Sequence, residues 1–233
     1  MVQEYDKLLK TYKRMLEMVD VFHFNSQNTR EVYEQFLDIP VKSEVVPITH
    51  NGVIDHRKLR TFKGKVLKLG FVGSEAPYKG LPMLKKVIAR INAEGFEDKI
   101  HLSVYGGRTG TDVELKNVVY MGRFTSNQMK AVYDSMDLLV VPSIWYETFG
   151  LTTVEGIQFG VPVLVSERVG AKDLVKQYAS QFVFDTEEEL FLILKRLISD
   201  RSEMVRYNRN IVHSKWKWSM KQHADDIVSK IYK

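Results

Sequence analysis

The stretch "DLLVVPSIWYETFGLTTVEGIQFGVPVLVS", residues 137–166, decides the fold. It begins and ends with short apolar runs, DLLVV (137–141) and VPVLVS (161–166), and a segment of helical character near 150–159 lies between them. Apolar runs without polar alternation are typical of strands that are buried on both faces of a parallel sheet. The stretch therefore predicts a strand, a helix and a second, parallel strand.

The same alternation extends on both sides of this stretch. Further strands are expected at 66–72, 100–105, 117–121 and 181–184, and further helices near 80–94, 126–135, 171–177 and 187–199. Ser126 is a candidate N-cap of the helix at 126–135. The alternation predicts an α/β fold: a doubly wound, mainly parallel Rossmann-like sheet of about six strands with helices on both faces. Ligands of such sheets bind beyond the carboxyl ends of the strands.

The first 50 residues predict a separate unit, an N-terminal α/β extension. A charged helix (4–18) is followed by a strand (19–25), a helix after Ser26 and an apolar run (43–48). So few strands make a poor independent core.

We therefore divide the chain into three parts. Residues 1–50 are the tail of an N-terminal domain or an N-terminal extension, residues 51–64 are an interdomain connection, and residues 65–233 form the Rossmann-like domain. A last helix is expected after Ser219.

Composition limits the kinds of site. The chain has no cysteine, and its six histidines lack metal-ligand spacing, so neither a disulfide nor a metal site is expected. No apolar run approaches the roughly 20 residues of a membrane span, and no secretory signal is evident, so we expect a cytoplasmic protein. The net charge of +5 favours anionic partners. No basic run is interleaved with aromatics, so we expect no nucleic acid partner.

Two glutamates, Glu147 and Glu155, flank the expected helix start near Phe149 or Gly150. The free amides and positive dipole end of a helix receive phosphate, and a carboxylate accepts both hydrogen bonds of a vicinal diol. Thr152 to Glu155 also fits a capping box, in which Glu155 would bond back to the helix start. The spacing alone leaves both explanations open.

A second turn, GFVGSEAPYKG (70–80), follows the first strand of the sheet. Gly73 loosens the strand end, and Lys79 opens the next helix, where its ammonium can reach an anion in the crevice. The turn matches neither the dinucleotide fingerprint nor the phosphate-loop pattern. A surface lysine is therefore the alternative explanation.

Together these residues resemble the signature of the retaining glycosyltransferases of family four, which have the GT-B fold of two Rossmann-like domains. The shared elements are Pro142, Ser143, Glu147, Phe149, Gly150, Glu155, Gly160, Pro162 and Gly170. LGFVGSEAPYKGLPMLKKVI (69–88) resembles that family's phosphate-binding turn, and residues 19–54 resemble the passage between its domains. The likeness covers roughly residues 15–233, and it identifies them with the C-terminal, donor-binding half.

The resemblance implies a role for each matching residue. Glu155 would bind the ribose hydroxyls of the nucleotide, Glu147 would contact the donor sugar and stabilise the reacting centre, and Lys79 would neutralise the leaving diphosphate. Backbone amides would hold that diphosphate, at Phe149, Gly150 and Leu151. No metal is implied, because fixed cations and dipoles stabilise the developing charge.

One departure from the family concerns the turn after Gly73. The family usually carries an arginine there, where this chain has Ser74. Arg108, Arg123 or a group outside the chain then substitutes, or donor binding is weak. Arg123 lies in the turn at 121–126, where base recognition is expected.

The resemblance implies the donor-binding portion of a retaining glycosyltransferase, which transfers a sugar from a UDP-, GDP- or ADP-linked donor to a hydroxyl acceptor without a cofactor. A glycan or lipid-linked acceptor would bind through an N-terminal domain that is absent from this chain, and the positive charge fits peripheral association with the inner face of a membrane. The alternative is a non-catalytic nucleotide-sugar-binding subunit of a split glycosyltransferase, which Ser74 favours. An epimerase or phosphorylase on a similar scaffold fits less well, because no acid-base or pyridoxal-lysine constellation is found.

Overall fold

A seven-stranded sheet forms the centre of the computed structural model, which describes residues 2–37 and 42–232. Its strands lie in the order β5-β6-β4-β3-β7-β8-β9, and all neighbours are parallel except β5 and β6. The strands are β3 (Leu67–Val72), β4 (Ile100–Tyr105), β5 (Thr109–Thr111), β6 (Val118–Gly122), β7 (Leu138–Val141), β8 (Val163–Ser166) and β9 (Val183–Phe184). The doubly wound, mainly parallel sheet is confirmed.

The burial of the central strands explains why their sequences are apolar throughout. Every residue of β7 and β8 is buried, as a strand covered on both faces requires. The edge strand β5 was not predicted, because its three residues are exposed and form no apolar run.

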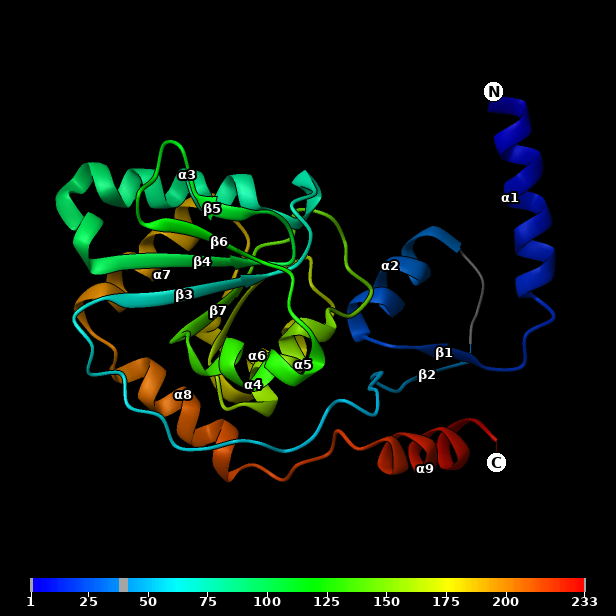
Figure 1. Ribbon diagram of the computed structural model, residues 1–233. Coiled ribbons are helices and arrows are strands. Elements are labelled where there is room, and N and C mark those ends of the chain that lie inside the picture. The colour runs from blue at the N-terminus through cyan, green and yellow to red at the C-terminus, as the bar shows by residue number, and fades with distance from the viewer. Residues whose placement is uncertain (1, 38–41, 233) are drawn as a thin grey trace.

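Helices cover both faces of the sheet (Figure 1). On one face lie α3 (Leu81–Ile91) and α7 (Glu187–Ser199), which the ion pair of Lys86 with Glu187 joins at 2.9 Å. The other face carries α4 (Met129–Asp134), α5 (Leu151–Gln158) and α6 (Lys172–Ala179). An additional helix, α8 (Ser202–His213), packs against α6 and was not predicted.

The helix starts correct one expectation and confirm another. Ser126 is not the cap before α4, because the cap position is taken by Thr125, whose amide donates to Gln128 Oε1 at 2.9 Å. Ser219 does cap α9 (Met220–Ile231), and its hydroxyl accepts a hydrogen bond from the Gln222 amide at 3.1 Å.

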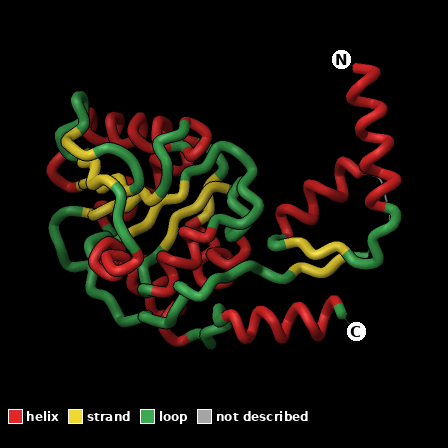
Figure 2. The backbone as a smooth tube through the Cα atoms, turned by 45° about the vertical axis from the view of Figure 1, so that its right-hand side comes forward, coloured by secondary structure: helices red, strands yellow, loops and turns green. Residues whose placement is uncertain are grey.

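The N-terminal unit comprises α1 (Val2–Leu16), β1 (Phe22–Phe24), α2 (Gln27–Leu37) and β2 (Ser43–Val45). β1 and β2 pair in parallel as a two-stranded sheet of their own. Figures 1 and 2 both show α9 beside this small sheet and α1 projecting away from the rest of the chain. None of the described helices has the length and apolar content needed to cross a membrane.

The strand order places a topological switch point between β3 and β7. From β3 the chain proceeds to β4 and β6 on one side, then returns to β7 on the other side. The loops that leave neighbouring β3 and β7 therefore diverge to opposite faces and open a crevice at the carboxyl ends of the strands.

Candidate functional site

A cavity of about 150 Å³ lies at this switch point. The end of β3 and the turn after it form one wall, and the loop between β7 and α5 forms the other. The lining residues are Phe71, Val72, Gly73, Lys79, Val140, Val141, Pro142, Ser143, Glu147, Gly150, Leu151 and Thr152. The two motifs that the sequence singled out thus meet in one place.

Gly80 allows the two loops to pack closely. Its φ is +80°, and a Cβ at this position would lie 1.7 Å from the carbonyl oxygen of Pro142. The Ile144 amide also donates to the carbonyl of Tyr78 at 3.0 Å. These contacts fix the turn that carries Lys79 against the loop that carries Glu147.

Lys79 and Glu147 form an ion pair that faces the cavity. Lys79 Nζ lies 2.9 Å from Glu147 Oε1, and the two side chains are 31% and 15% exposed. The Ser143 hydroxyl donates to the same carboxylate oxygen. The pair brings an ammonium and a carboxylate together where an incoming charged ligand can contact both.

The N-terminus of α5 opens onto the same cavity. Gly150 is its cap residue, with φ +96°, and no side chain caps this described helix end. The first amides of a helix have no partner within the helix, so those of Leu151 and Thr152 are available to an anion. The Phe149 side chain faces away, because it is buried and packs against Trp218 with ring centroids 5.9 Å apart.

Glu155 does not close a capping box, since its carboxylate turns to α4. Tyr133 donates its hydroxyl to Glu155 Oε2 at 2.7 Å, and His50 Nε2 lies 3.8 Å from Oε1. Burial, together with the charge of Glu155, raises the pKa of Tyr133 well above its ordinary value, so the phenol stays a donor. Sequence reasoning missed Tyr133 and His50, because only the tertiary structure brings them to Glu155.

The structure separates the other predicted binding residues. Gly73 lines the cavity, whereas Ser74 and Arg123 are exposed and are not among its lining residues. Arg108 does not replace the family's arginine in this arrangement, because it lies over the Tyr120 ring and its Nε lies 3.2 Å from Glu75 Oε2.

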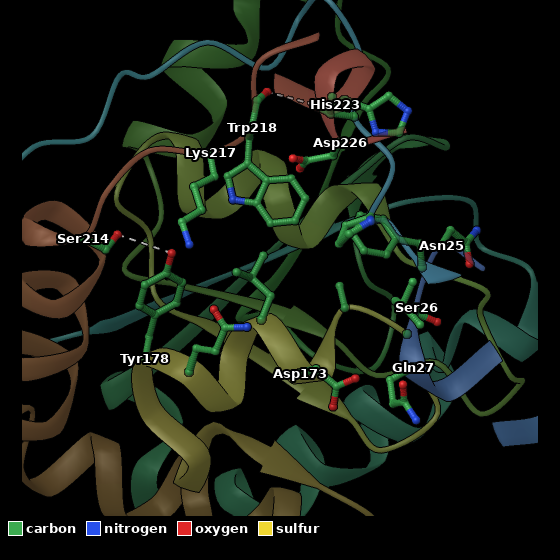
Figure 3. A pocket seen from close by; sticks show the side chains of 18 of the residues that line it. Asn25, Ser26, Gln27, Asp173, Tyr178, Ser214, Lys217, Trp218, His223 and Asp226 are labelled. Carbon is green, nitrogen blue, oxygen red and sulfur yellow. Dashed lines mark hydrogen bonds between the residues drawn. The ribbon is translucent and has the colours of Figure 1, made fainter. Parts of the chain in front are cut away.

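A larger cavity of about 860 Å³ lies between the N-terminal unit and the sheet domain. In Figure 3, Asn25, Ser26 and Gln27 stand on one side of it, and Tyr178 and Trp218 stand on the other. No group of three His, Cys, Asp or Glu side chains that suits a metal ion occurs among residues 2–37 and 42–232.

Relatives by sequence share the sheet domain. The family model described as "Glycosyl transferases group 1" matches residues 54–213. A GDP-mannose-dependent alpha-mannosyltransferase of Mycolicibacterium smegmatis is 31% identical over 122 residues, which cover 51% of this chain and 30% of that protein. An uncharacterized 41.2 kDa protein in the cps region of Klebsiella pneumoniae is 26% identical over 69% of this chain and 47% of its own length. The chain thus spans less than half the length of these two relatives.

Solved structures extend the fold likeness to nearly the whole chain. Anabaena HepE in complex with UDP and glucose has a TM-score of 0.71 at 16% identity, with 96% of this chain and 66% of that chain covered. The UDP-forming α,α-trehalose-phosphate synthase from Burkholderia xenovorans has a TM-score of 0.72 at 14% identity, with 97% and 63% covered. With the family model matched over most of its length, this chain belongs to the group 1 glycosyl transferases and has the fold of the C-terminal half of a GT-B glycosyltransferase.

Proposed function

We propose that the chain is the donor-binding portion of a retaining glycosyltransferase and that a nucleotide sugar binds in the crevice between β3 and β7. The observation that carries the proposal is the Lys79–Glu147 ion pair, which faces a cavity also lined by the uncapped start of α5. A cation and free helix amides match a diphosphate, while a carboxylate matches sugar hydroxyls and developing positive charge.

The proposed pose follows the direction of α5. The diphosphate lies on the amides of Gly150 and Leu151 and against the Lys79 ammonium, and the Phe149 amide extends this row. The ribose then lies toward Glu155, whose carboxylate Tyr133 holds in place. The donor sugar lies at the other end, toward Glu147.

The reaction that fits this pose proceeds with retention. The acceptor oxygen bonds to the anomeric carbon on the face from which the diphosphate departs. The bond from that carbon to the diphosphate oxygen breaks, its electron pair stays with the diphosphate, and the acceptor proton passes to a diphosphate oxygen. Lys79 and the helix amides stabilise the growing negative charge, and Glu147 stabilises the positive charge on the sugar.

We also propose the domain division that the sequence predicted: residues 1–50 complete an acceptor-binding half, residues 51–64 connect the halves, and residues 65–233 bind the donor. The separate β1–β2 sheet supports this, because two strands rarely form a stable unit alone. The helix α1 adds support, since four large side chains at helical spacing are each at least half exposed: Tyr5, Leu8, Tyr12 and Met15. Such a stripe is expected to pack against further structure.

The relatives support a nucleotide-sugar donor but leave its base open. HepE was solved with UDP and with UDP-glucose, and the mycobacterial relative is named for GDP-mannose. We propose a UDP-, GDP- or ADP-linked sugar as donor and a glycan or lipid-linked hydroxyl as acceptor, with peripheral association at the inner face of an anionic membrane favoured by the net charge of +5.

Calorimetric titration with UDP, GDP and ADP, followed by a sugar-transfer assay, tests this function. One of the three diphosphates is expected to bind, while the isolated chain transfers sugar slowly or not at all. Binding of none would refute the donor site, and efficient transfer by this polypeptide alone would refute the half-enzyme view.

A second candidate is a non-catalytic subunit that holds the nucleotide sugar for a partner chain. The observation that favours it is the exposed Ser74 at the position of the family's arginine, with Arg108 engaged by Glu75. Replacing Ser74 by arginine distinguishes the two. If the chain is a weakened enzyme, Ser74→Arg should raise donor affinity and donor hydrolysis together; for a binding subunit, hydrolysis should stay absent.

A further inference from the structure

The loop that carries Glu147 is held by a distant part of the chain. The Thr148 carbonyl accepts a hydrogen bond from the Ser26 hydroxyl at 2.6 Å and one from the Thr29 hydroxyl at 2.9 Å. A hydroxyl has one proton to donate, and the Thr148 oxygen is nearer to Thr29 Oγ1 than the alternative acceptor, Asn25 Oδ1 at 3.2 Å. We call Ser26 and Thr29 the hydroxyl latch.

The latch completes a row of three held carbonyls. The Glu147 carbonyl accepts from the Gly170 amide at 3.0 Å, and the Phe149 carbonyl accepts from the Ala171 amide at 2.6 Å. Those two bonds come from the loop after β8, whereas the middle carbonyl, that of Thr148, is held from the N-terminal unit. The peptide between Glu147 and the start of α5 therefore depends on both parts of the molecule.

The surroundings of the latch are shaped for it. A Cβ on Gly170 would lie 2.3 Å from the Thr148 oxygen and 2.6 Å from Ser26 Oγ, so the approach requires a glycine there. Ser26 is only 3% exposed, and its oxygen also accepts from the Thr29 amide at 3.1 Å, which ties the latch to the start of α2. Figure 3 shows Ser26 at the edge of the large cavity.

We propose that Ser26 and Thr29 are positioning residues of the donor site. By fixing the Thr148 peptide they set the direction of the Glu147 carboxylate and of the first amides of α5. The N-terminal unit thereby helps to build the diphosphate site, although none of its residues lines the cavity. A displacement of α2 is transmitted to Glu147 through one shared carbonyl. This inference rests on the proposed function.

The test compares UDP titrations of the natural chain and of Ser26→Ala/Thr29→Val. The double variant removes both donors, and we expect UDP affinity to fall about five- to tenfold. Thr29→Val alone should weaken binding about two- to threefold, while Thr29→Ser, which keeps the hydroxyl, should bind as the natural chain does. If the double variant does not fold, the two single variants decide the outcome.

Thr49→Val is the matched control. It removes another threonine hydroxyl that bridges distant segments, donated to the Trp218 carbonyl at 2.9 Å, but leaves Thr148 untouched. Hydrogen exchange in a peptide spanning 146–152 gives a second readout, which should speed up in the latch variants and not in Thr49→Val.

The outcomes separate the latch from the donor site. Loss of UDP affinity in Lys79→Met with none in Ser26→Ala/Thr29→Val would overturn the latch alone. Absence of binding by the natural chain to UDP, GDP and ADP would overturn the donor site and the latch with it.

Discussion

Replacing Lys79 by methionine tests the electrostatics of the site. The natural ammonium lies 2.9 Å from Glu147 Oε1, and the Ser143 hydroxyl also donates to that oxygen. Methionine keeps most of the apolar stem but removes the charge. Glu147, only 15% exposed, then presents an uncompensated carboxylate to an arriving diphosphate.

The expected loss follows from the geometry. Two unit charges about 4 Å apart interact by about 4 kcal/mol at an effective dielectric constant of about 20. Lys79 is 31% exposed and already shares its charge with Glu147, so water and the existing ion pair reduce its net contribution. We expect a loss of about 1.5–3 kcal/mol in binding free energy, roughly a 10- to 150-fold weaker affinity for UDP.

A double-mutant cycle measured by calorimetry separates attraction from repulsion. Adding Glu147→Gln to Lys79→Met removes the exposed negative charge, and about 1 kcal/mol of affinity should return. Lys86→Met is the control, because Lys86 lies on the same stretch of chain but pairs with Glu187 away from the cavity. An affinity for UDP within twofold of the natural value in folded Lys79→Met would refute this reasoning.

Three further predictions concern the ribose site, a glycine and acid stability. Glu155→Gln should weaken UDP binding by about 1–3 kcal/mol if the carboxylate accepts ribose hydroxyls, and calorimetry with inorganic pyrophosphate, which has no ribose, should show no such loss. Gly80→Ala should lower the melting temperature far more than Gly95→Ala: both have positive φ, but only at Gly80 would a Cβ collide with backbone, so the costs are several kcal/mol against about 1 kcal/mol. Burial alone would raise the pKa of Asp112, but hydrogen bonds, led by that from Lys85, outweigh it and lower the pKa. This stabilisation is present above the ordinary aspartate pKa of about 3.9 and is lost as pH falls below it, so Asp112→Asn should flatten the acid loss of stability in chemical denaturation series.

The strands and most helices were predictable because their signals are local. β7 and β8 are buried over their whole length, so an uninterrupted apolar run marks each of them. By contrast, α8 was overlooked, although its buried Met204, Tyr207 and Ile211 stand at helical spacing. That spacing is the signal that would have found it.

The site was predictable only where its residues are close in sequence. The meeting of Lys79 with Glu147 followed from the strand order of a doubly wound sheet, in which the first strand neighbours the strand after the crossover. The partners of Glu155 come from α4 and from the connection at His50, and no local pattern marks them. The capping box at Glu155 failed for the same reason, because a phenol outside the helix competes for the carboxylate.

The measurement that tests the central claim most directly is a crystal structure of the chain soaked with UDP. We expect diphosphate oxygens within hydrogen-bonding distance of the Gly150 and Leu151 amides and of Lys79 Nζ, and ribose hydroxyls on the Glu155 carboxylate. A diphosphate bound elsewhere, or Glu155 still turned to Tyr133 with the ribose out of its reach, would contradict the account.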